Sequence, residues 1–357
     1  YGMKNSNAIL EINIKNLANN YKAINKIYKN NLTGATIKAN AYGIGSLEVL
    51  KILYKYNCRH FFFATLNEAL NLIKFKKEAF FYVLNGLENN ELAIFRKNKI
   101  IPILNSYKEL KKIYYSKNDK DKLPIGIQVE TGLNRLGISI NDLKKMKFKD
   151  INLHIILSHL ASSEEINNRY NKFQQKNFEK YFSFFDKIRY KSLLNSTGIL
   201  QNKEYHYDIS RPGIALYGGH HDTYLEKIIK PIIKLKGKIL QVKTINKNEY
   251  IGYNQTYKSN KKIKIAIVGI GYADGIFRSY NKKGYLYNKN EKFKIIGRIS
   301  MDSITIDISN SKKRITEGKY ITVIDYKNDI NKMAKKCNTI SNEILTSISN
   351  RVTRVYL

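Results

Sequence analysis

Short apolar runs alternate with longer amphipathic segments through the first two-thirds of the chain. The apolar runs, rich in Ile, Val and Phe, predict strands at residues 35–39, 61–64, 80–84, 101–104, 125–129, 153–157, 192–195 and 214–217. The polar segments between them predict helices at residues 46–56, 66–74 and 107–114 and a long one near 164–188. This rhythm is typical of a parallel sheet covered by helices. About eight such units fit a (β/α)8 barrel, although an open doubly wound sheet would show the same rhythm.

The pattern changes after about Pro231. Residues 234–242, 262–268, 292–296, 303–308 and 320–324 predict short strands, and helical periodicity returns only at 341–349. We therefore predict an α/β protein with a (β/α)8 TIM barrel at residues 9–233, followed by a mostly β domain at residues 234–357. Residues 10–14 alternate as a strand does, and we expect this first strand to join the β domain. Residues 1–8 are a lead that resembles a tag remnant, and they are left out of the fold prediction.

Length and composition exclude several classes of protein. The chain has 357 residues, of which 43% are hydrophobic and 12% aromatic, so its apolar surface suffices for packed cores. No apolar run approaches the roughly 20 residues of a membrane-spanning helix and no signal pattern is seen, so we expect a cytoplasmic protein without membrane contact. Cys58 and Cys337 stand far apart without metal-ligand spacing, which argues against a disulfide framework and a zinc site.

The net charge is strongly positive. The 63 Lys and Arg residues outnumber 29 Asp and Glu residues, which gives a formal charge of +34 at pH 7. Such an excess favours contact with nucleic acids and anionic surfaces. The lysines are spread over almost every segment, however, with no basic arm and no Arg-rich tract. This distribution favours solvated helix faces over a nucleic-acid site.

Two candidate reactive groups follow predicted barrel strands. Lys38 leaves the first strand at the end where barrel active sites form, and a partly desolvated lysine can form a Schiff base with a carbonyl or with pyridoxal phosphate. The alternative is a solvated strand end, and the glycines that follow are too few for a dinucleotide motif. Arg135 offers a fork of donors suited to a carboxylate or a phenolate oxygen, or it is a surface arginine of a turn.

Further candidates lie at later strand ends. His159 ends a buried strand, where it serves as a core residue, a proton relay or a ring-stacking group. Asn195 and Ser196 precede a possible helix start, which either binds phosphate through free N–H groups or is an ordinary N-cap. Arg211 and its neighbours fall at the last barrel unit, and barrel phosphate sites commonly lie after the seventh and eighth strands. This order favours the barrel over the open sheet.

Other polar segments are less informative in isolation. Residues 252–257, 271–275 and 297–302 predict turns of the β domain. His220-His221-Asp222 is more typical of a surface than of a metal site, because its potential ligands are contiguous in one loop. We expect no metal.

Taken together, these segments resemble the alanine racemase family of fold-type III pyridoxal-phosphate enzymes, from about Ile9 to Leu357. Six motifs occur in the family's order. They are Lys38-Ala-Asn-Ala-Tyr42-Gly, Thr131-Gly-Leu-Asn-Arg135-Leu-Gly, His159, Asn195-Ser196, Arg211-Pro-Gly213-Ile214-Ala-Leu-Tyr-Gly, and the set of Tyr253, Gly-Tyr272-Ala-Asp-Gly and Met301-Asp302. The resemblance implies a bacterial enzyme that interconverts L-alanine and D-alanine with pyridoxal 5'-phosphate, supplies D-alanine for peptidoglycan, and works as a homodimer with shared active sites.

The resemblance also implies the roles of the reacting residues. Lys38 carries the cofactor as an internal aldimine and is the base for D-alanine, and Tyr253 of the partner subunit is the base for L-alanine. Inversion requires two bases, because the proton leaves one face of the carbon and returns to the other. His159 is expected to stabilise the phenolate of Tyr253, whose reference pKa of about 10 is otherwise too high. Arg211 contacts the pyridine nitrogen and cannot accept its proton, which favours racemisation over transamination.

The remaining roles concern binding. Arg135 is expected to contact the cofactor's phenolic oxygen and the substrate carboxylate, and Met301 to hold the substrate. The other implied cofactor contacts come from Tyr42, Asn195, Ser196, Gly213 and Ile214. Positions at the entrance or behind these contacts are Tyr272, Asp302 and Gln128.

Four positions depart from the family's pattern. Gln128 stands where many members have a carbamylated lysine, so it can donate a neutral hydrogen bond near Arg135 but supplies no negative charge. The others are Ser300 in place of cysteine, Ile44 in place of histidine, and Asn350 in place of a tyrosine whose loss could loosen phosphate binding or widen the entrance. Substrate range therefore stays open, and a broader amino-acid racemase is an alternative.

Three further alternatives are weaker. A decarboxylase of the same barrel class, acting on a basic amino acid, usually has a cysteine where this chain has Ser300. A non-catalytic pyridoxal-phosphate carrier resembles the barrel alone and lacks the domain that holds Tyr253. A nucleic-acid or anionic-surface binder would show steeply salt-dependent DNA binding and no cofactor.

Overall fold

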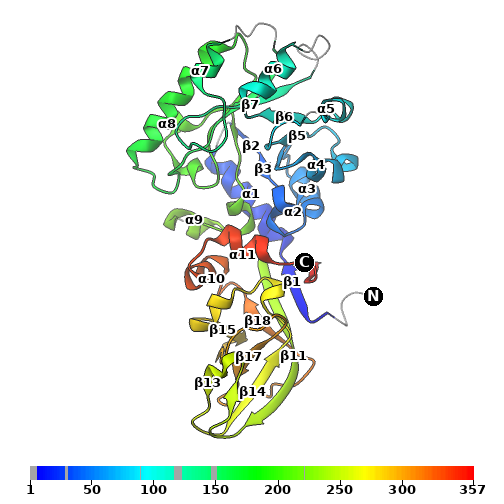
Figure 1. Cartoon of the computed structure of the whole chain (residues 1–357), viewed down its shortest axis with the longest axis vertical. Coiled ribbons are helices and arrows are strands. Elements are labelled where there is room, and N and C mark those ends of the chain that lie inside the picture. Colours follow the sequence, from blue (N-terminus) through cyan, green and yellow to red (C-terminus); the bar gives the residue numbers. More distant parts are fainter. Residues whose placement is uncertain (1–5, 29–30, 89, 116–122, 146–150, 221) are drawn as a thin grey trace.

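The computed structural model describes residues 6–28, 31–88, 90–115, 123–145, 151–220 and 222–357. The molecule is elongated, with a helix-covered lobe at one end and a sheet-rich lobe at the other (Figure 1). Most of the predicted lead, and His221 of the His220–Asp222 segment, lie outside the described residues.

The first lobe is built on a curled parallel sheet. Its strands are β2 (Leu32–Thr33), β3 (Ala35–Thr36), β4 (His60–Phe63), β5 (Phe80–Val83), β6 (Ile101–Leu104), β7 (Ile125–Gln128), β8 (Leu153–Leu157), β9 (Tyr190–Ser192) and β10 (Ile209–Ser210). Consecutive strands from β3 to β9 pair in parallel, and β10 pairs in parallel with β2. Because β2 and β3 are one run of chain interrupted at Gly34, this run connects β10 to β4 and curls the sheet on itself. The predicted barrel-like α/β domain is confirmed.

Helices cover the outside of this sheet. They are α1 (Ile14–Ile27), α3 (Ser46–Lys55), α4 (Leu66–Asn71), α5 (Leu92–Asn98), α6 (Tyr107–Tyr115), α7 (Ile140–Leu143), α8 (Arg169–Lys180) and α9 (Thr223–Ile228). Helix α1 buries Leu17, Tyr21 and Ile24, which share one face at helical spacing. Before α4 and α6 stand two Ser/Thr-x-x-Glu capping boxes, in which the glutamate accepts N–H bonds from the residues before the helix.

Apolar side chains fill much of the barrel interior, together with a trio of polar rings. The apolar part is formed by Phe62, Ile101, Ile103, Ile155, Leu157 and Ile209. Among them, the buried Tyr82 hydroxyl lies 2.8 Å from His60 Nδ1 and 3.0 Å from His154 Nε2. His60 begins β4 and His154 lies early in β8, so the trio closes the barrel near the amino-terminal ends of its strands.

Several predicted elements of the first lobe were wrong in extent or type. Residues 214–217 form a buried 3-10 helix rather than the eighth strand, and the eighth strand is β10. The first strand ends at Thr36 instead of 39, and β9 ends at Ser192, where the prediction began. The long helix near 164–188 is shorter, with α8 followed by the 3-10 helix Phe182–Phe184. A buried 3-10 turn and a buried strand show the same short apolar run, so the sequence pattern does not separate them.

The second lobe is mostly β structure, as predicted. One sheet has the strand order β16 (Glu291–Lys294), β15 (Tyr285–Asn288), β18 (Tyr320–Ile324), β11 (Ile233–Ile245), β1 (Ala8–Ile12) and β19 (Thr353–Tyr356), while β14 (Ile263–Val268) joins β11 to β17 (Ile304–Asp307). Strand β1 pairs antiparallel with β11 and parallel with β19, so the predicted first strand lies in this sheet. A small hairpin is made by β12 (Tyr250–Ile251) and β13 (Tyr257–Lys258).

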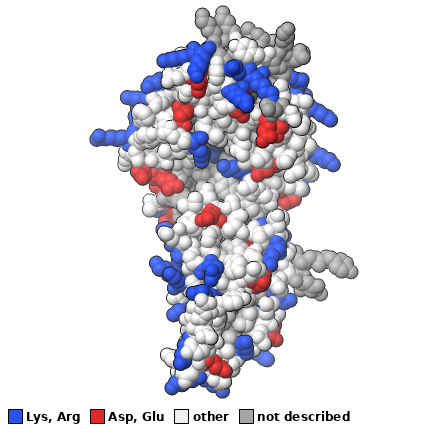
Figure 2. Space-filling model, viewed as in Figure 1, with Lys and Arg blue, Asp and Glu red and all other residues white. Residues whose placement is uncertain are grey.

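Two helices lie between the lobes (Figure 1). They are α10 (Ile330–Cys337), which the sequence pattern did not predict, and α11 (Ser341–Ser347), which it did. In the part of the chain that the structure describes, no helix has the length and apolar character needed to cross a membrane. Figure 2 shows Lys and Arg scattered over the visible face of both lobes and mixed with Asp and Glu, which agrees with the distribution in the sequence.

Candidate active site

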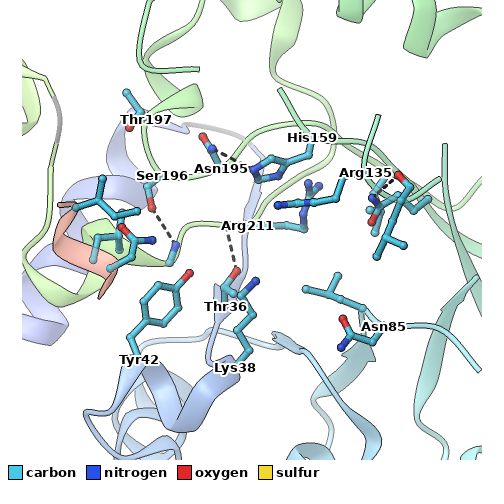
Figure 3. A pocket seen from close by; sticks show the side chains of 18 of the residues that line it. Thr36, Lys38, Tyr42, Asn85, Arg135, His159, Asn195, Ser196, Thr197 and Arg211 are labelled. Carbon is cyan, nitrogen blue, oxygen red and sulfur yellow. Dashed lines mark hydrogen bonds between the residues drawn. The ribbon is translucent and has the colours of Figure 1, made fainter. Parts of the chain in front are cut away.

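A cavity of about 490 Å³ opens at the carboxyl ends of the barrel strands (Figure 3). Its wall includes every site residue predicted in the barrel, namely Lys38, Tyr42, Gln128, Arg135, His159, Asn195, Ser196, Arg211, Gly213 and Ile214. These residues come from loops far apart in sequence. They converge because the carboxyl ends of parallel strands meet at one end of a barrel.

The turn that carries Lys38 is left-handed. Four successive residues, Ala39 to Tyr42 in α2 (Lys38–Tyr42), have φ between 51° and 56°. This conformation costs roughly 1–2 kcal/mol for each non-glycine residue, so the turn needs external support. Part of that support comes from β19, where Arg354 Nε donates to Gly43 O and the Tyr356 hydroxyl donates to Ile44 O, each at 2.8 Å.

The Lys38 amine is prepared to act as a nucleophile or base. Partial burial lowers its pKa, the positive charges of Arg135 and Arg211 lower it further, and the carboxylate of Glu68 acts in the opposite direction. A lowered pKa leaves more of the amine uncharged at neutral pH.

Arg211 and His159 face the same part of the cavity. Arg211 is only 7% exposed, and its guanidinium donates to Ser192 Oγ and to Ser158 O. Burial lowers the pKa of Arg211 to about 10, so it stays charged at neutral pH and cannot accept a proton. Burial, followed by the charges of Arg211, Arg135 and Lys38, lowers the pKa of His159 to about 3, so its imidazole is neutral.

The hydrogen bonds of Asn195 fix which nitrogen of His159 carries the proton. Asn195 Oδ1 accepts from Gly198 N at 2.9 Å, so its Nδ2 is the group that points to His159 Nε2, 3.4 Å away. Because an amide nitrogen only donates, Nε2 is the acceptor and the proton lies on Nδ1.

Small polar groups line the end of the cavity away from Arg135 (Figure 3). Ser196 Oγ accepts from Gly213 N at 2.9 Å and from Ala215 N at 3.2 Å, which leaves its own proton free to donate to an anion. Burial raises the pKa of Tyr42 to about 12, so its hydroxyl also remains a donor. A Cβ at Gly213 would lie 2.4 Å from this hydroxyl, so glycine is required for the close approach. Two hydroxyl donors beside Gly213 and Ile214, which also line the cavity, are suited to a phosphate.

Gln128 supports the loop that holds Arg135. Its Nε2 donates to Leu136 O at 2.9 Å, directly after the arginine. Gln128 is buried, whereas Arg135 is exposed at the cavity mouth. The neutral hydrogen bond expected of Gln128 is therefore present, and it acts through the backbone next to Arg135.

The predicted residues of the second lobe lie outside this cavity. Tyr253 is 67% exposed, Met301 53% and Tyr272 42%, and Asp302 is also exposed. Three of them, Tyr272, Met301 and Asp302, lie in segments that hydrogen bonds or an ion pair hold in place. Tyr272 N donates to Ser300 O and Ala273 N to Met301 O, and Arg351 pairs with Asp274 at 2.6 Å and with Asp302 at 2.7 Å.

The sequence interpretation missed some residues of the cavity. Thr36, Leu84, Asn85, Leu136, Leu157, Glu164, Thr197, Ile340 and Asn342 also line it. Asn350, expected to affect the phosphate site or the entrance, is exposed after α11 and is not on the wall. Asn342, at the start of that helix, is the asparagine of this segment that reaches the cavity. Of the other departures, Ile44 is fully buried and Ser300 serves through its backbone.

No cluster of three or more His, Cys, Asp or Glu side chains that could hold a metal occurs among the described residues. His220 donates its backbone N–H to Asn331 Oδ1, in the junction with α10.

Comparison with known proteins gives consistent matches over nearly the whole chain. Residues 12–221 match the family model "Alanine racemase, N-terminal domain", and residues 232–356 match "Alanine racemase, C-terminal domain". The alanine racemase of Rickettsia akari is 37% identical over 98% of both chains, and that of Brucella suis 34% over 98% of this chain and 93% of its own. A solved structure of alanine racemase from Bartonella henselae with covalently bound pyridoxal phosphate has a TM-score of 0.91 and 32% identity, covering 99% of this chain and 100% of its own.

Proposed function

The chain belongs to the alanine racemase family, and on that premise we propose that it interconverts L-alanine and D-alanine with pyridoxal 5'-phosphate as its cofactor. The observation that carries the proposal is the convergence of all the predicted barrel residues on one cavity wall. A supply of D-alanine for peptidoglycan is the role that this activity would serve.

The donor groups of the cavity fit the cofactor. The Lys38 amine would hold it covalently, and the hydroxyls of Tyr42 and Ser196 with the backbone at Gly213 and Ile214 would hold its phosphate. Arg211 would contact the pyridine nitrogen, and Arg135 the phenolic oxygen. When bound, pyridoxal phosphate withdraws electrons from the substrate's α-carbon, which makes the proton on that carbon more acidic.

Lys38 would move this proton on one face of the α-carbon. Its lowered pKa leaves more of the amine uncharged than an exposed lysine would have, and a base must be uncharged to accept a proton. Tyr253 of the partner subunit would move the proton on the other face. The fixed charge of Arg211 beside the ring nitrogen would keep that nitrogen unprotonated. The cofactor would then withdraw electrons from the α-carbon more weakly, which favours return of the proton to this carbon over transamination.

The exposure of Tyr253, Tyr272 and Met301 supports the proposal of a homodimer with shared active sites. Backbone hydrogen bonds fix the chain at Tyr272 and Met301, and none of the three side chains lines the cavity of the barrel. In a two-fold dimer each lobe of this kind would meet the barrel mouth of the other subunit.

The test of the activity is Lys38→Ala. We expect purified protein to show the absorbance of bound cofactor and to racemise alanine, and borohydride to trap the cofactor on Lys38. Lys38→Ala should lose both the trapped adduct and at least about 10⁴-fold in turnover, because the same side chain binds the cofactor and moves the proton. Full racemisation by Lys38→Ala would exclude the assignment.

A broader amino-acid racemase is the second candidate. Gln128 supports the Arg135 loop without adding negative charge, so the field around the substrate carboxylate differs from that of relatives with a charged group there. Chirality assays over a panel of L-amino acids measure the range, and we expect alanine to be turned over first. Release of carbon dioxide from ornithine, lysine or arginine would instead indicate the decarboxylase.

A further inference from the structure

The left-handed turn after Lys38 is held from the neighbouring barrel unit by Glu68. The Glu68 side chain starts on α4 and crosses to the preceding βα loop, where Oε1 accepts from Ala39 N at 2.8 Å. Its other oxygen, Oε2, accepts from Ala64 N at 2.8 Å and from Thr65 N at 3.3 Å. One carboxylate therefore ties the residue next to Lys38 to the start of a helix.

The same arrangement occurs a second time in the barrel without a reactive lysine. Glu109 on α6 accepts from Asn105 N and Ser106 N through Oε2, at 2.7 and 2.8 Å, and from Leu87 N through Oε1, at 2.8 Å. Both glutamates are half-buried, both complete a capping box, and both reach back to the preceding loop. They differ in what they hold, because Leu87 follows an ordinary loop while Ala39 opens a run of four left-handed residues.

We propose that Glu68 is a positioning residue for Lys38, and that its bond to the Ala39 N–H holds the strained turn in the conformation that presents the lysine to the cavity. A carboxylate is suited to this, since hydrogen bonds to a charged acceptor are about twice as strong as neutral ones. The significance for catalysis rests on the proposed function of Lys38. The claim that Glu68 holds the turn is independent of that function.

The charges around the amine support this role. Arg135, Arg211 and the neutral His159 face it from the loops after β7, β10 and β8, the Tyr42 hydroxyl lines the same cavity, and Glu68 is the negative group that raises the Lys38 pKa. The Glu164 carboxylate also lines the cavity, but the charges that shift the Lys38 pKa are those of Arg135, Arg211 and Glu68, so removing the Glu68 charge would lower this pKa further.

The experiment compares Glu68→Gln with Glu109→Gln in the full-length chain. Each variant loses one capping-box carboxylate, so we expect similar decreases in melting temperature. Glu68→Gln alone should increase amide hydrogen exchange in residues 38–43, by about fivefold, because an amide offers one acceptor oxygen in place of two. Exchange is measured by mass spectrometry before and after removal of bound cofactor, so it does not depend on activity.

A second readout concerns the lysine itself. The pH midpoint for borohydride-trappable attachment of pyridoxal phosphate to Lys38 should move to lower pH in Glu68→Gln and stay unchanged in Glu109→Gln. Glu68→Asp, which keeps the charge on a shorter side chain, should restore most of the midpoint. If Glu68→Gln does not fold, the exchange and the pH midpoint of Glu68→Asp test the positioning role in its place.

The outcomes separate the two proposals. If the unmodified chain does not racemise alanine but Glu68→Gln still loosens residues 38–43, the proposed function fails and the holding role stands. If the unmodified chain racemises alanine and the two glutamine variants match in exchange and in pH midpoint, the positioning role of Glu68 is overturned.

Discussion

The two lobes hold their predicted functional residues in opposite ways. In the barrel, Arg211 is 7% exposed and shares one cavity with Lys38 and His159. In the sheet-rich lobe, Tyr253 is 67% exposed and Met301 53%, and neither lines the cavity that holds Lys38. The barrel therefore presents charged side chains in a concave cavity, whereas the other lobe presents its predicted residues on its surface.

The difference has a physical origin in the two sheets. Parallel strands deliver their carboxyl-terminal loops to one end, so side chains converge there without further design. In the antiparallel sheet the corresponding loops are fixed by local bonds, such as Tyr272 N to Ser300 O, and by Arg351. Their geometry is set before any partner arrives.

The strongest challenge to this comparison is Tyr253→Phe. If the sheet-rich lobe supplies one of the two bases, loss of the Tyr253 hydroxyl should reduce turnover in both directions by about a thousandfold, within the ~10²–10⁴ range for general acid–base catalysis. Cofactor affinity, measured by absorbance titration, should not change, because the barrel binds the cofactor. Unchanged turnover in both directions would remove Tyr253 from the mechanism.

Mixing two inactive variants tests whether the half-sites come from different subunits. Lys38→Ala keeps Tyr253, and Tyr253→Phe keeps Lys38, so a mixed dimer has one complete site. After subunit exchange the mixture should recover up to about a quarter of normal activity, since half of the dimers are mixed and each has one working site. If the two variants exchange, as native mass spectrometry would show, and activity stays at the level of the parents, the sites are not shared.

Two arginines near the C-terminal end of the chain serve different lobes, and their replacement should have smaller effects. Arg351 binds the Asp274 and Asp302 carboxylates of the sheet-rich lobe, while Arg354, three residues later, donates to Gly43 O in the turn after Lys38. Arg351→Met should lower turnover by about tenfold at unchanged cofactor affinity, and Arg354→Met should weaken cofactor affinity by a similar factor. The two are measured by initial rates and by cofactor titration, with Arg59→Met, which also loses bonds to backbone carbonyls but away from the cavity, as the control. If Arg351→Met and Arg354→Met changed turnover and cofactor affinity in the same way, the two arginines would not serve different lobes.

The smallest effect concerns the barrel floor, which should affect stability without affecting catalysis. Burial, with the charge of Arg189, lowers the pKa of His60 to about 4 and of His154 to about 3. Because the unfolded chain binds protons on these histidines first, their contribution is fully present above about pH 6.5 and is lost as the pH falls towards 4 and 3. Tyr82→Phe should lower the free energy of unfolding by about 1–3 kcal/mol at neutral pH, because both rings lose their partner.

Denaturant titration across this pH range measures the stability, and racemase assays of the folded variant measure turnover. A Tyr82→Phe protein that unfolds like the parent would show that the trio adds no stability. A loss of turnover in the folded variant would show that the trio of Tyr82, His60 and His154 affects the cavity at the opposite end of the barrel.

Much of the barrel could be predicted because its strands are buried on both faces. The strands from β4 to β8 are mostly apolar, and two of the predicted site residues, Arg135 and His159, follow the apolar runs of β7 and β8. The failures have a common cause. Strand β10 has two residues and no pattern of its own, and the apolar run 214–217 is buried in a 3-10 turn.

The cavity residues that were missed depend on tertiary contacts. Asn342 belongs to a helix that lies between the lobes, and nothing in its neighbours distinguishes it from Asn350. The Thr65-x-x-Glu68 capping box was readable in the sequence, but so was Ser106-x-x-Glu109. Only the fold shows which glutamate lies next to the reactive lysine.

The position of β19 has a consequence for the order of synthesis. Ile9 pairs with Thr353, and the same strand supplies Arg354 and Tyr356 to the turn after Lys38. A ribosome would therefore finish the whole barrel long before the residues that brace its lysine turn exist. A nascent chain can assemble the parallel sheet and form the bond from Ala39 N to Glu68, yet the bonds from Arg354 and Tyr356 to this turn form only after β19 emerges and docks.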